Sequence, residues 1–517
     1  MINNGARRWW ALGAVSLAVL AVGLDGTVLS VALPTLSKAL KASESDLQWF
    51  TSIYLLVLAA SMLPVGLLGD RYGKKKVLLI SLAFFGLGSA ASGYSTSVVE
   101  FMAARVLMGI AGAGVIVMAI SALTVLFAKE ERPKAVGVWS AANFLSLPLG
   151  PILGGWLLTH YWWGWVFLIN VPVAMVGLVA GAVLIPESRS LERPNVDAVG
   201  VTSSAVGLVA LMYGLIEAGQ HGWSNVGALL FIFVGLVILA GFFGWERRLT
   251  RQPGGEPLLD LSLFESRSFT WGVILAAFVI LSMFGVLFTM PQFFQGVLGT
   301  NPIGSGLRLL PLMAGLVVGA IPAAKLASLL GAKVVTTAGF VLLAAGLFIG
   351  SMTRASSSSV FIMCWMALLG LGIGTAIATS SSAALVELTE ERSGVGSAVL
   401  QAVNKTGAPL GAAILGSVLS AGYLAHLHLS GLPASAAAAV RQSVFGGVAV
   451  AQQLHSTALL TSVRAAFASG MDRALMVSGG IALIGAVLSV LFLPQTNVSL
   501  ESKDTDARKE GETIGIQ

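Results

Sequence analysis

Long, uninterrupted apolar segments constrain this chain more than any other feature of its sequence. A helix needs about 20 mostly apolar residues to cross a bilayer, and segments of that length recur along nearly the whole chain. We expect fourteen membrane-spanning helices, at 9–33, 47–69, 76–95, 99–127, 134–159, 164–185, 197–218, 225–245, 269–291, 304–326, 333–352, 358–386, 394–421 and 473–494. The sequence therefore predicts an all-α polytopic membrane protein.

The composition supports this interpretation. Charged residues make up 10% of the chain and hydrophobic residues 56%, whereas soluble domains carry about 25% charged residues. The 61 glycines suit helices that must approach one another closely in lipid. Cys364 is the single cysteine, which excludes a disulfide framework and a cysteine-based metal site.

The distribution of basic residues predicts the orientation. If the N-terminus is inside, 21 of the 30 Lys and Arg residues fall in inner segments and 6 in outer segments. This is the bias expected of cytoplasmic loops. We therefore expect the protein to lie in the inner (cytoplasmic) membrane, with both termini in the cytoplasm. The same bias explains the net charge of +6 without nucleic acid. The first span is too long for a signal peptide, and we expect it to be retained.

A faint internal repeat divides the chain. Three pairs of landmarks recur 257 or 258 residues apart: Leu33-Pro34 with Met290-Pro291, Gly73 with Gly331, and Pro151 with Pro409. Parallel repeats of this kind are typical of transporters, with the substrate site where the repeats meet. We therefore predict an N-terminal six-helix bundle at 1–188, an inserted two-helix segment at 189–252 and a C-terminal six-helix bundle at 253–517.

Four motifs carry a resemblance to a known family. The loop after the second span reads Gly66-Leu67-Leu68-Gly69-Asp70-Arg71-Tyr72-Gly73-Lys74-Lys75-Lys76, and it resembles the loop signature of the major facilitator superfamily; its glycine spacing does not fit a phosphate-binding loop. Leu24–Pro34, Arg105–Gly109 and Leu149–Gly155 are similar to motifs of the first, fourth and fifth helices of the fourteen-helix drug:proton antiporters in that superfamily.

The resemblance implies both a fold and a function. The implied fold is two six-helix bundles with two inserted central helices. The implied function is export of lipophilic drugs, antibiotics or antiseptics by alternating access, driven by the proton gradient and without a cofactor. It also implies an inner gate that includes Gly66, Asp70, Arg71, Gly73 and Lys74. Gly150, Pro151, Gly154 and Gly155 match the helix associated with antiport, where proline permits a kink and glycines permit close helix packing.

Asp25 and Arg105 are the strongest candidates for chemistry, because a charge at a helix centre costs about 2.5–3.5 kcal/mol on insertion scales. Asp25 lies roughly 24 Å from the inner surface at 1.5 Å per residue, and Arg105 lies roughly 21 Å from it in a 30 Å core. A pair between neighbouring helices is therefore feasible. One interpretation is a static ion pair that fixes packing. The other, which we favour, is that Asp25 carries the proton and Arg105 couples its release to conformation.

Several polar residues in the spans are candidates for the substrate cavity. Lys405 lies near the midplane, where its stem is too short to reach water. Gln401, Asn404 and Lys405 stand where some multication exporters of the family branch that the chain resembles have carboxylates. A cationic group there puts a preference for cations in doubt. The full candidate set is Asn143, Gln401, Asn404, Lys405, Arg308 and Glu217.

Two further segments lie outside the predicted spans. The outer segment 422–472 is either a set of amphipathic helices or a plain loop, and the polar tail 497–517 is expected to be disordered.

The partners that we expect are small lipophilic substrates, protons and the bilayer, and we expect the chain to be a monomer. An exporter dedicated to one endogenous metabolite or antibiotic is an open alternative. The spans lack the clustered nucleophiles or carboxylates of a membrane enzyme, so we do not expect an enzyme.

Overall fold

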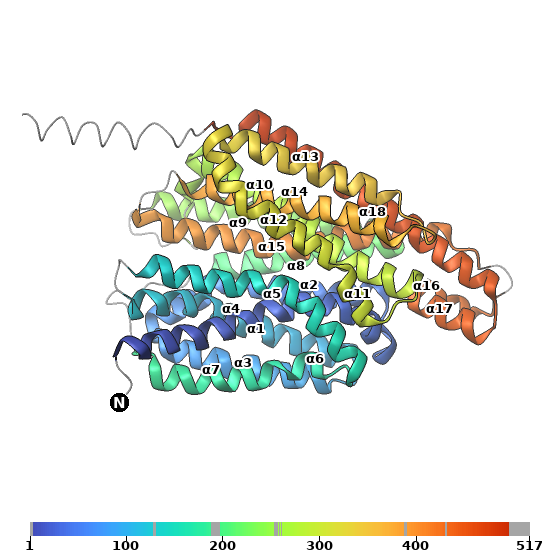
Figure 1. The fold of residues 1–517 in the computed structure, drawn as a ribbon, viewed down its shortest axis with the longest axis horizontal. Helices are drawn as coiled ribbons and strands as arrows, with labels where there is room; N and C mark the ends of the chain where they lie inside the picture. Colours follow the sequence, from blue (N-terminus) through green and yellow to red (C-terminus); the bar gives the residue numbers. More distant parts are fainter. Residues whose placement is uncertain are drawn as a thin grey trace, which may run out of the picture.

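The structure is a computed structural model that describes residues 4–127, 131–187, 197–252, 257, 259, 261–386, 390–429 and 432–495. All regular elements in these ranges are helical (Figure 1). In the same ranges, twelve helical segments are long and apolar enough to cross a membrane. The predicted class, an all-α polytopic membrane protein, is therefore confirmed.

The helices fall into three groups along the chain. The first group is α1 (Asn4–Ala39), α2 (Glu44–Tyr72), α3 (Lys74–Tyr94), α4 (Val98–Leu126), α5 (Arg132–His160), α6 (Trp165–Leu168) and α7 (Asn170–Leu184). The second is α8 (Ala198–His221) and α9 (Val226–Arg251). The third is η1 (Leu261–Glu265), α10 (Arg267–Gln292), η2 (Phe293–Val297), α11 (Pro302–Arg308), α12 (Leu310–Leu330), α13 (Ala332–Ser351), α14 (Ser359–Val386), α15 (Glu390–His426), α16 (Ala434–Gln442), α17 (Val444–Gln453) and α18 (Thr457–Phe492).

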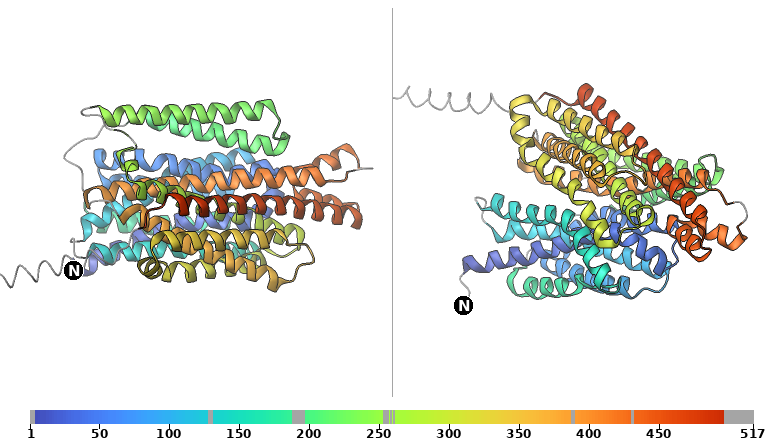
Figure 2. Two further views of the ribbon diagram at one scale, coloured as in Figure 1. Left: turned by 90° about the horizontal axis from the view of Figure 1, so that it is seen from above. Right: turned by 45° about the vertical axis from the view of Figure 1, so that its right-hand side comes forward.

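The long helices run side by side and alternate in direction between two ends of the molecule. We call the end that holds the start of α1 the N-terminal face, and the opposite end, which holds α16 and α17, the far face (Figure 1). The first and third groups form two bundles. The pair α8–α9 forms a separate layer beside them (Figure 2), where α8 packs against α2 and α15. The division of the chain at 188 and 252 stays a prediction.

The two bundles meet at the far face and diverge toward the N-terminal face (Figure 2). One hydrophobic core joins Leu36 and Phe50 of the first bundle to Phe288, Phe293 and Leu309 of the second. All five lie toward the far face, and we call this core, which also extends through the second bundle, the far-face core. A second core lies almost wholly within the first bundle, toward the N-terminal face. The described residues therefore show a molecule whose halves are closed together at one end only.

The repeat landmarks have matching roles in the two bundles. Gly73 joins α2 to α3 with φ of 113°, and Gly331 joins α12 to α13 with φ of 88°. Both values lie in a region that favours glycine. Pro151 and Pro409 mark two contacts between the bundles. The Pro409 carbonyl oxygen accepts a 3.4 Å hydrogen bond from Ser52 of α2, and the Pro151 carbonyl oxygen faces Gly306 of α11.

Segment 422–472 is helical in its described part, so the plain-loop alternative is wrong. The α15 helix continues to His426, α16 and α17 follow, and α18 begins at Thr457, sixteen residues before the start that we predicted. We call α16 and α17 the cap. The far-face core buries Val440 of α16 and Val444 and Phe445 of α17, which anchors the cap to the bundles. Residues 459, 463, 466 and 467 bury one stripe of α18, which explains its early start. The tail at 497–517 lies outside the described residues.

Candidate functional site

Asp25 and Arg105 form an ion pair between α1 and α4. The distance from Arg105 Nη1 to Asp25 Oδ2 is 2.5 Å, and both side chains are fully buried. The pairing that the predicted depths allowed is therefore present. Because removing either partner would leave the other charge buried and alone, the pair must act as a unit.

Aromatic rings hold the guanidinium in place. The Arg105 Cζ atom lies 4.2 Å from the centre of the Tyr54 ring and 5.9 Å from that of Phe167, an attractive geometry for a cation over a π face. Tyr54 is fixed because its hydroxyl donates a 3.0 Å hydrogen bond to the Val22 carbonyl oxygen of α1. The site thus joins α1, α2, α4 and α6. Tyr54 was not among the predicted site residues, although a phenol within a predicted span was a visible signal.

The ion pair is incompletely satisfied. Asp25 Oδ1 and the Nε and Nη2 atoms of Arg105 are buried without a hydrogen-bond partner among the described residues. Unsatisfied buried polar atoms of this kind cost about 1–3 kcal/mol each, and more where charged. A change in hydration or separation would therefore alter the energy of the pair strongly, which a fully satisfied structural pair would resist.

A small cavity reaches the Asp25 side chain. Its volume is about 210 Å³, and residues of α1, α5, α6 and α7 line it. Asn170 is the other polar side chain in its wall, and its amide Nδ2 donates a 3.3 Å hydrogen bond to Ser89. The rest of the wall is apolar. Asn170 was not among the predicted residues, although an amide in an otherwise apolar span could have drawn attention.

The glycines of the predicted antiport helix pack α5 against two other helices. A Cβ atom added to Gly150 would lie 3.0 Å from the Val28 backbone nitrogen, and one on Gly154 would lie 2.4 Å from Val28 Cγ2, both on α1. A Cβ on Gly155 would lie 2.8 Å from the Pro302 carbonyl oxygen in the second bundle. The predicted close approach at these glycines is confirmed. The role of this helix in antiport stays a prediction.

The gate signature lies at the N-terminal face, between α2 and α3. Gly69 sits against Met118 of α4, and Gly73 sits against the Glu187 carboxylate beyond α7. Glu187 also accepts a 3.3 Å hydrogen bond from the Lys75 backbone N–H. These contacts stay within the first bundle. The Asp70 side chain lies outside the described side chains, and the gating role of Gly66, Asp70, Arg71, Gly73 and Lys74 stays a prediction.

Substituting Gly73 with alanine is expected to lower the thermal unfolding temperature and the transport rate. The φ of 113° is unfavourable for a residue with a Cβ, at a cost of order 1–3 kcal/mol, and the added atom would meet Glu187. Gly13→Ala, where nothing lies within 4 Å of an added Cβ, is the matched control. Equal unfolding temperatures for the two variants in a detergent melt would contradict this prediction.

The five candidate substrate side chains that the structure describes lie on three different helices, α8, α11 and α15. Gln401, Asn404 and Lys405 share α15, and no described carboxylate pairs with Lys405. Lys405 lies about one helical turn before Pro409 on α15. Arg308 ends α11 near the far face, where it donates to the Gly304 carbonyl oxygen over 3.3 Å.

The other two candidates differ in what the structure says about them. Glu217 lies on α8 in the outer layer and pairs with His221 over 2.9 Å. The side chain of Asn143 lies outside the described side chains. A substrate role for the six residues stays a prediction.

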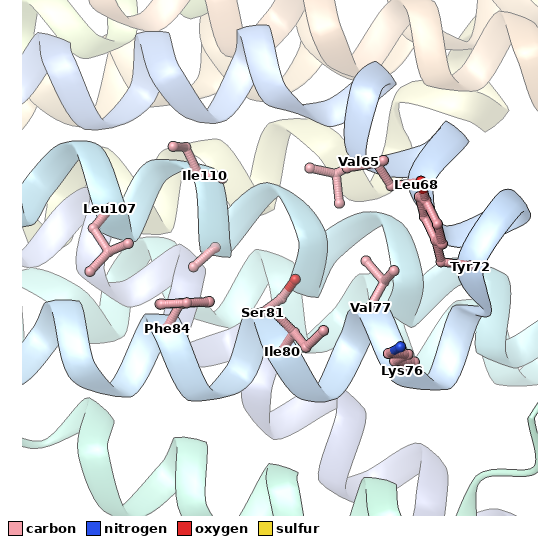
Figure 3. A pocket seen from close by; sticks show the side chains of 11 residues that line it. Val65, Leu68, Tyr72, Lys76, Val77, Ile80, Ser81, Phe84, Leu107 and Ile110 are labelled. Carbon is pink, nitrogen blue, oxygen red and sulfur yellow. The ribbon is translucent and has the colours of Figure 1, made fainter. Parts of the chain in front are cut away.

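The first bundle also carries a groove on its own surface (Figure 3). Its volume is about 480 Å³, and residues of α2, α3 and α4 line it. Leu68, Ile80, Phe84 and Ile110 in its wall are exposed, and Lys76 stands at its end toward the N-terminal face. The second bundle contributes no lining residue. The groove is therefore separate from the Asp25 cavity and from the place where the bundles meet.

A family model described as "Major Facilitator Superfamily" matches residues 15–412. The chain belongs to the major facilitator superfamily. It is therefore a multi-pass membrane transporter and not an enzyme, as the sequence predicted. The architecture agrees, since a bacterial homologue of the human lysosomal transporter Spinster, solved in an inward-facing conformation, superposes with a TM-score of 0.67 at 17% identity over 94% of this chain and 97% of that one.

Curated relatives in this superfamily cover nearly the whole chain. The tetracenomycin C resistance and export protein of Streptomyces glaucescens is 34% identical over 94% of this chain and 91% of its own length. The multidrug efflux pump LfrA of Mycolicibacterium smegmatis is 32% identical over 94% and 96%. The methyl viologen resistance protein SmvA of Salmonella typhimurium is 32% identical over 93% and 97%. Two of these relatives are thus named for export or efflux of an antibiotic or of several drugs, and the third for resistance to a toxic compound.

Proposed function

We propose that this transporter exports lipophilic, drug-like molecules across the cytoplasmic membrane in exchange for protons, by alternating access. The buried and incompletely satisfied Asp25–Arg105 pair carries the proposal. It places one ionisable carboxyl group beside a cavity inside the first bundle, in a molecule whose halves meet at the far face and diverge toward the N-terminal face. The names of the relatives supply the direction of transport and the class of substrate.

Asp25 would bind a proton in one conformation and release it in the other. A carboxyl group favours its neutral form when it loses contact with water and its charged form when Arg105 is close. Movement of α4 relative to α1 would change both influences together. One proton that moves through 100 mV releases about 2.3 kcal/mol, which is enough to drive a substrate uphill.

The membrane topology belongs to the same proposal. Besides the twelve segments that meet length and hydropathy criteria, α2 and α5 have 29 residues each and run alongside them, which would give fourteen spans. The basic residues gather at the N-terminal face, so that face would be cytoplasmic and the far face external. With the far face closed, the structure would represent a state open to the cytoplasm. The proton gradient would supply the energy, so transport would need no cofactor, and one chain would suffice for it.

Reconstituted vesicles test the proposal directly. A fluorescent, lipophilic dye should move uphill when a pH gradient is imposed, and an uncoupler should stop it. Movement that ignores pH on both sides, or that requires nucleotide hydrolysis, would refute proton-coupled export.

An exporter of one antibiotic or metabolite is the second candidate, favoured by the relative that exports tetracenomycin C. A panel of chemically unrelated substrates separates the two functions. Uphill export of many of them supports multidrug export, whereas export of one compound class supports the dedicated exporter.

Replacing Lys405 with alanine is expected to change the substrate range. The ammonium group lies on α15 without a described ion-pair partner, so its removal should favour cationic substrates and disfavour anionic ones, by roughly tenfold for one unit charge near the pathway. Export rates for cationic, neutral and anionic dyes measure this. Lys405→Arg keeps the charge and serves as the control. Identical profiles for the alanine variant and the wild type would assign Lys405 to packing.

A further inference from the structure

A second buried carboxyl group lies near the far face, away from Asp25. Glu44 occupies the first turn of α2, and its side chain is 5% exposed. It does not cap the helix, because Ser43 and Asp46 form the capping box: the Ser43 N–H donates to Asp46 Oδ2 over 2.8 Å, and the Asp46 N–H donates to Ser43 Oγ over 3.2 Å. Glu44 Oε1 has no hydrogen-bond partner among the described residues. Helix capping therefore does not explain this burial.

Glu44 faces the place where the two bundles meet. The side chain of Gln292, at the end of α10 in the second bundle, is close enough to influence the Glu44 carboxyl, and so is Tyr423 of α15. One turn along α2, Gln48 is fully buried, and its side chain lies so close to Gly416 of α15 that an added Cβ would come within 2.9 Å of Gln48 Cδ. The carboxyl group is thus enclosed by polar side chains from both bundles.

These polar groups have unused hydrogen-bonding capacity. Both amide atoms of Gln48 and the Oε1 atom of Gln292 are buried without a partner among the described residues. The Tyr423 hydroxyl is engaged, since it donates to the Val440 carbonyl oxygen of α16 over 2.7 Å. We call Glu44, Gln48, Gln292 and Tyr423 the far-face cluster. While the bundles are closed, the unpaired atoms of this cluster are kept from water, so the closed state is sensitive to any charge on Glu44.

The charges around the far-face cluster do not neutralise a carboxylate. Between Phe288 and Val297, α10 and η2 carry no titratable side chain. On α15 the nearest titratable groups are Tyr423 and, one turn on, His426, which contacts Arg473 of α18 over 3.5 Å. On α2 itself Asp46 is acidic and engaged in the capping box. No described Lys or Arg lies within ion-pair distance of Glu44, so a buried negative charge there would be costly.

Burial accordingly raises the pKa of Glu44 to about 7, against the lowering effect of hydrogen bonding from Gln292. Glu44 precedes the predicted span at 47–69, so it belongs to the outer end of α2. In a conformation with the bundles apart at the far face, water would reach the carboxyl group and its pKa would return toward the ordinary value of about 4.3.

We propose that Glu44 is a second proton-binding site, and that its protonation holds the two bundles together at the far face. The proposal rests on the proposed alternating access and on the external position of the far face. Two protons arriving from outside would then act in order. One would neutralise Asp25 in the opened molecule, and the other, bound by Glu44, would favour closure behind it.

Linkage fixes the sign of the pH dependence. The pKa of Glu44 is higher in the closed state, so protonation stabilises closure fully below the ordinary pKa, and this contribution is lost as the pH rises through about 7. Acidification from pH 8 to pH 5 should therefore shift the equilibrium toward the closed far face by on the order of ten- to a hundredfold.

Distances between spin labels test this on the full-length protein in lipid nanodiscs. With Cys364 replaced by serine, Tyr94→Cys on α3 and Val360→Cys on α14 place labels at exposed far-face positions (67% and 69% exposed), one on each bundle. The wild-type background should show a long-distance population at pH 8 that falls by tenfold or more at pH 5. Glu44→Gln, which mimics the protonated form, should show the short distance at both pH values.

Two further variants keep the test decisive. Glu44→Asp retains a titratable group and should retain the pH response, and Glu100→Gln removes a far-face carboxylate that is bonded to Thr96 and should leave the response unchanged. The response should also survive in an Asp25→Asn background, which separates this site from the proposed proton carrier. A wild type whose distances ignore pH would overturn the proposal. So would a response that Asp25→Asn removes and Glu44→Gln retains.

Discussion

Replacing Asp25 with asparagine is expected to reduce pH-driven export to the rate of protein-free vesicles. Asparagine has nearly the same volume and can still accept a hydrogen bond from Arg105, so it should disturb the helix packing less than alanine, even though Arg105 loses its counter-charge. It cannot bind or release a proton near neutral pH. The interaction between Arg105 and residue 25 would therefore no longer change with protonation. Dye efflux from vesicles with an imposed pH gradient, at equal protein content, measures the loss.

Two comparisons separate coupling from folding. Asp25→Glu keeps a titratable group and should retain part of the export, whereas Asp25→Ala should unfold more easily because Arg105 would lose its buried partner, an effect of about 3–5 kcal/mol. If Asp25→Asn exported dye at the normal pH-driven rate, the ion pair would be structural and the proton would travel elsewhere. Glu44 would then be the next carboxyl group to examine.

The sequence predicted the helices well because hydropathy is a local property. The length of an apolar segment decides whether it can cross a bilayer, and this alone placed the helices in order. It also predicted the Asp25–Arg105 pair, since a charge deep in lipid requires a partner. The predicted start of the last helix was wrong because residues 457–472 become helical by packing against neighbouring helices and the cap. Hydropathy does not report such packing.

The parts of the site that depend on contacts between side chains of different helices were harder to predict. Tyr54 and Asn170 contact the site from α2 and α7; each is a visible polar group in its span, but the sequence does not say which side chains it meets. Glu44 was overlooked because it lies just outside a predicted span, where a carboxyl group is normally solvated. Its burial arises only when α10 and α15 of the other bundle cover it. Such contacts between distant segments have no signature in a single sequence.

The contact between α5 and α11 offers the last test, since it joins the two bundles at the far face. A valine at Gly155 would place its Cβ 2.8 Å from the Ile303 Cα and from the Pro302 carbonyl oxygen. Backbone atoms cannot rotate away as side chains do, so the two helices must separate. Overpacking of this kind costs typically about 1–3 kcal/mol, which corresponds to a change of about 5- to 150-fold in the balance between two states.

Because α11 belongs to the second bundle, this cost falls on the conformation closed at the far face. Gly155→Val should therefore slow export by a factor in that range and lengthen the distance between Tyr94→Cys and Val360→Cys labels at every pH. Gly241→Val on α9 carries the same helix-propensity cost, yet nothing lies within 4 Å of its added Cβ. Export by Gly155→Val equal to that by Gly241→Val would mean that the α5–α11 contact does not control closure, and that the far-face core alone holds the bundles together.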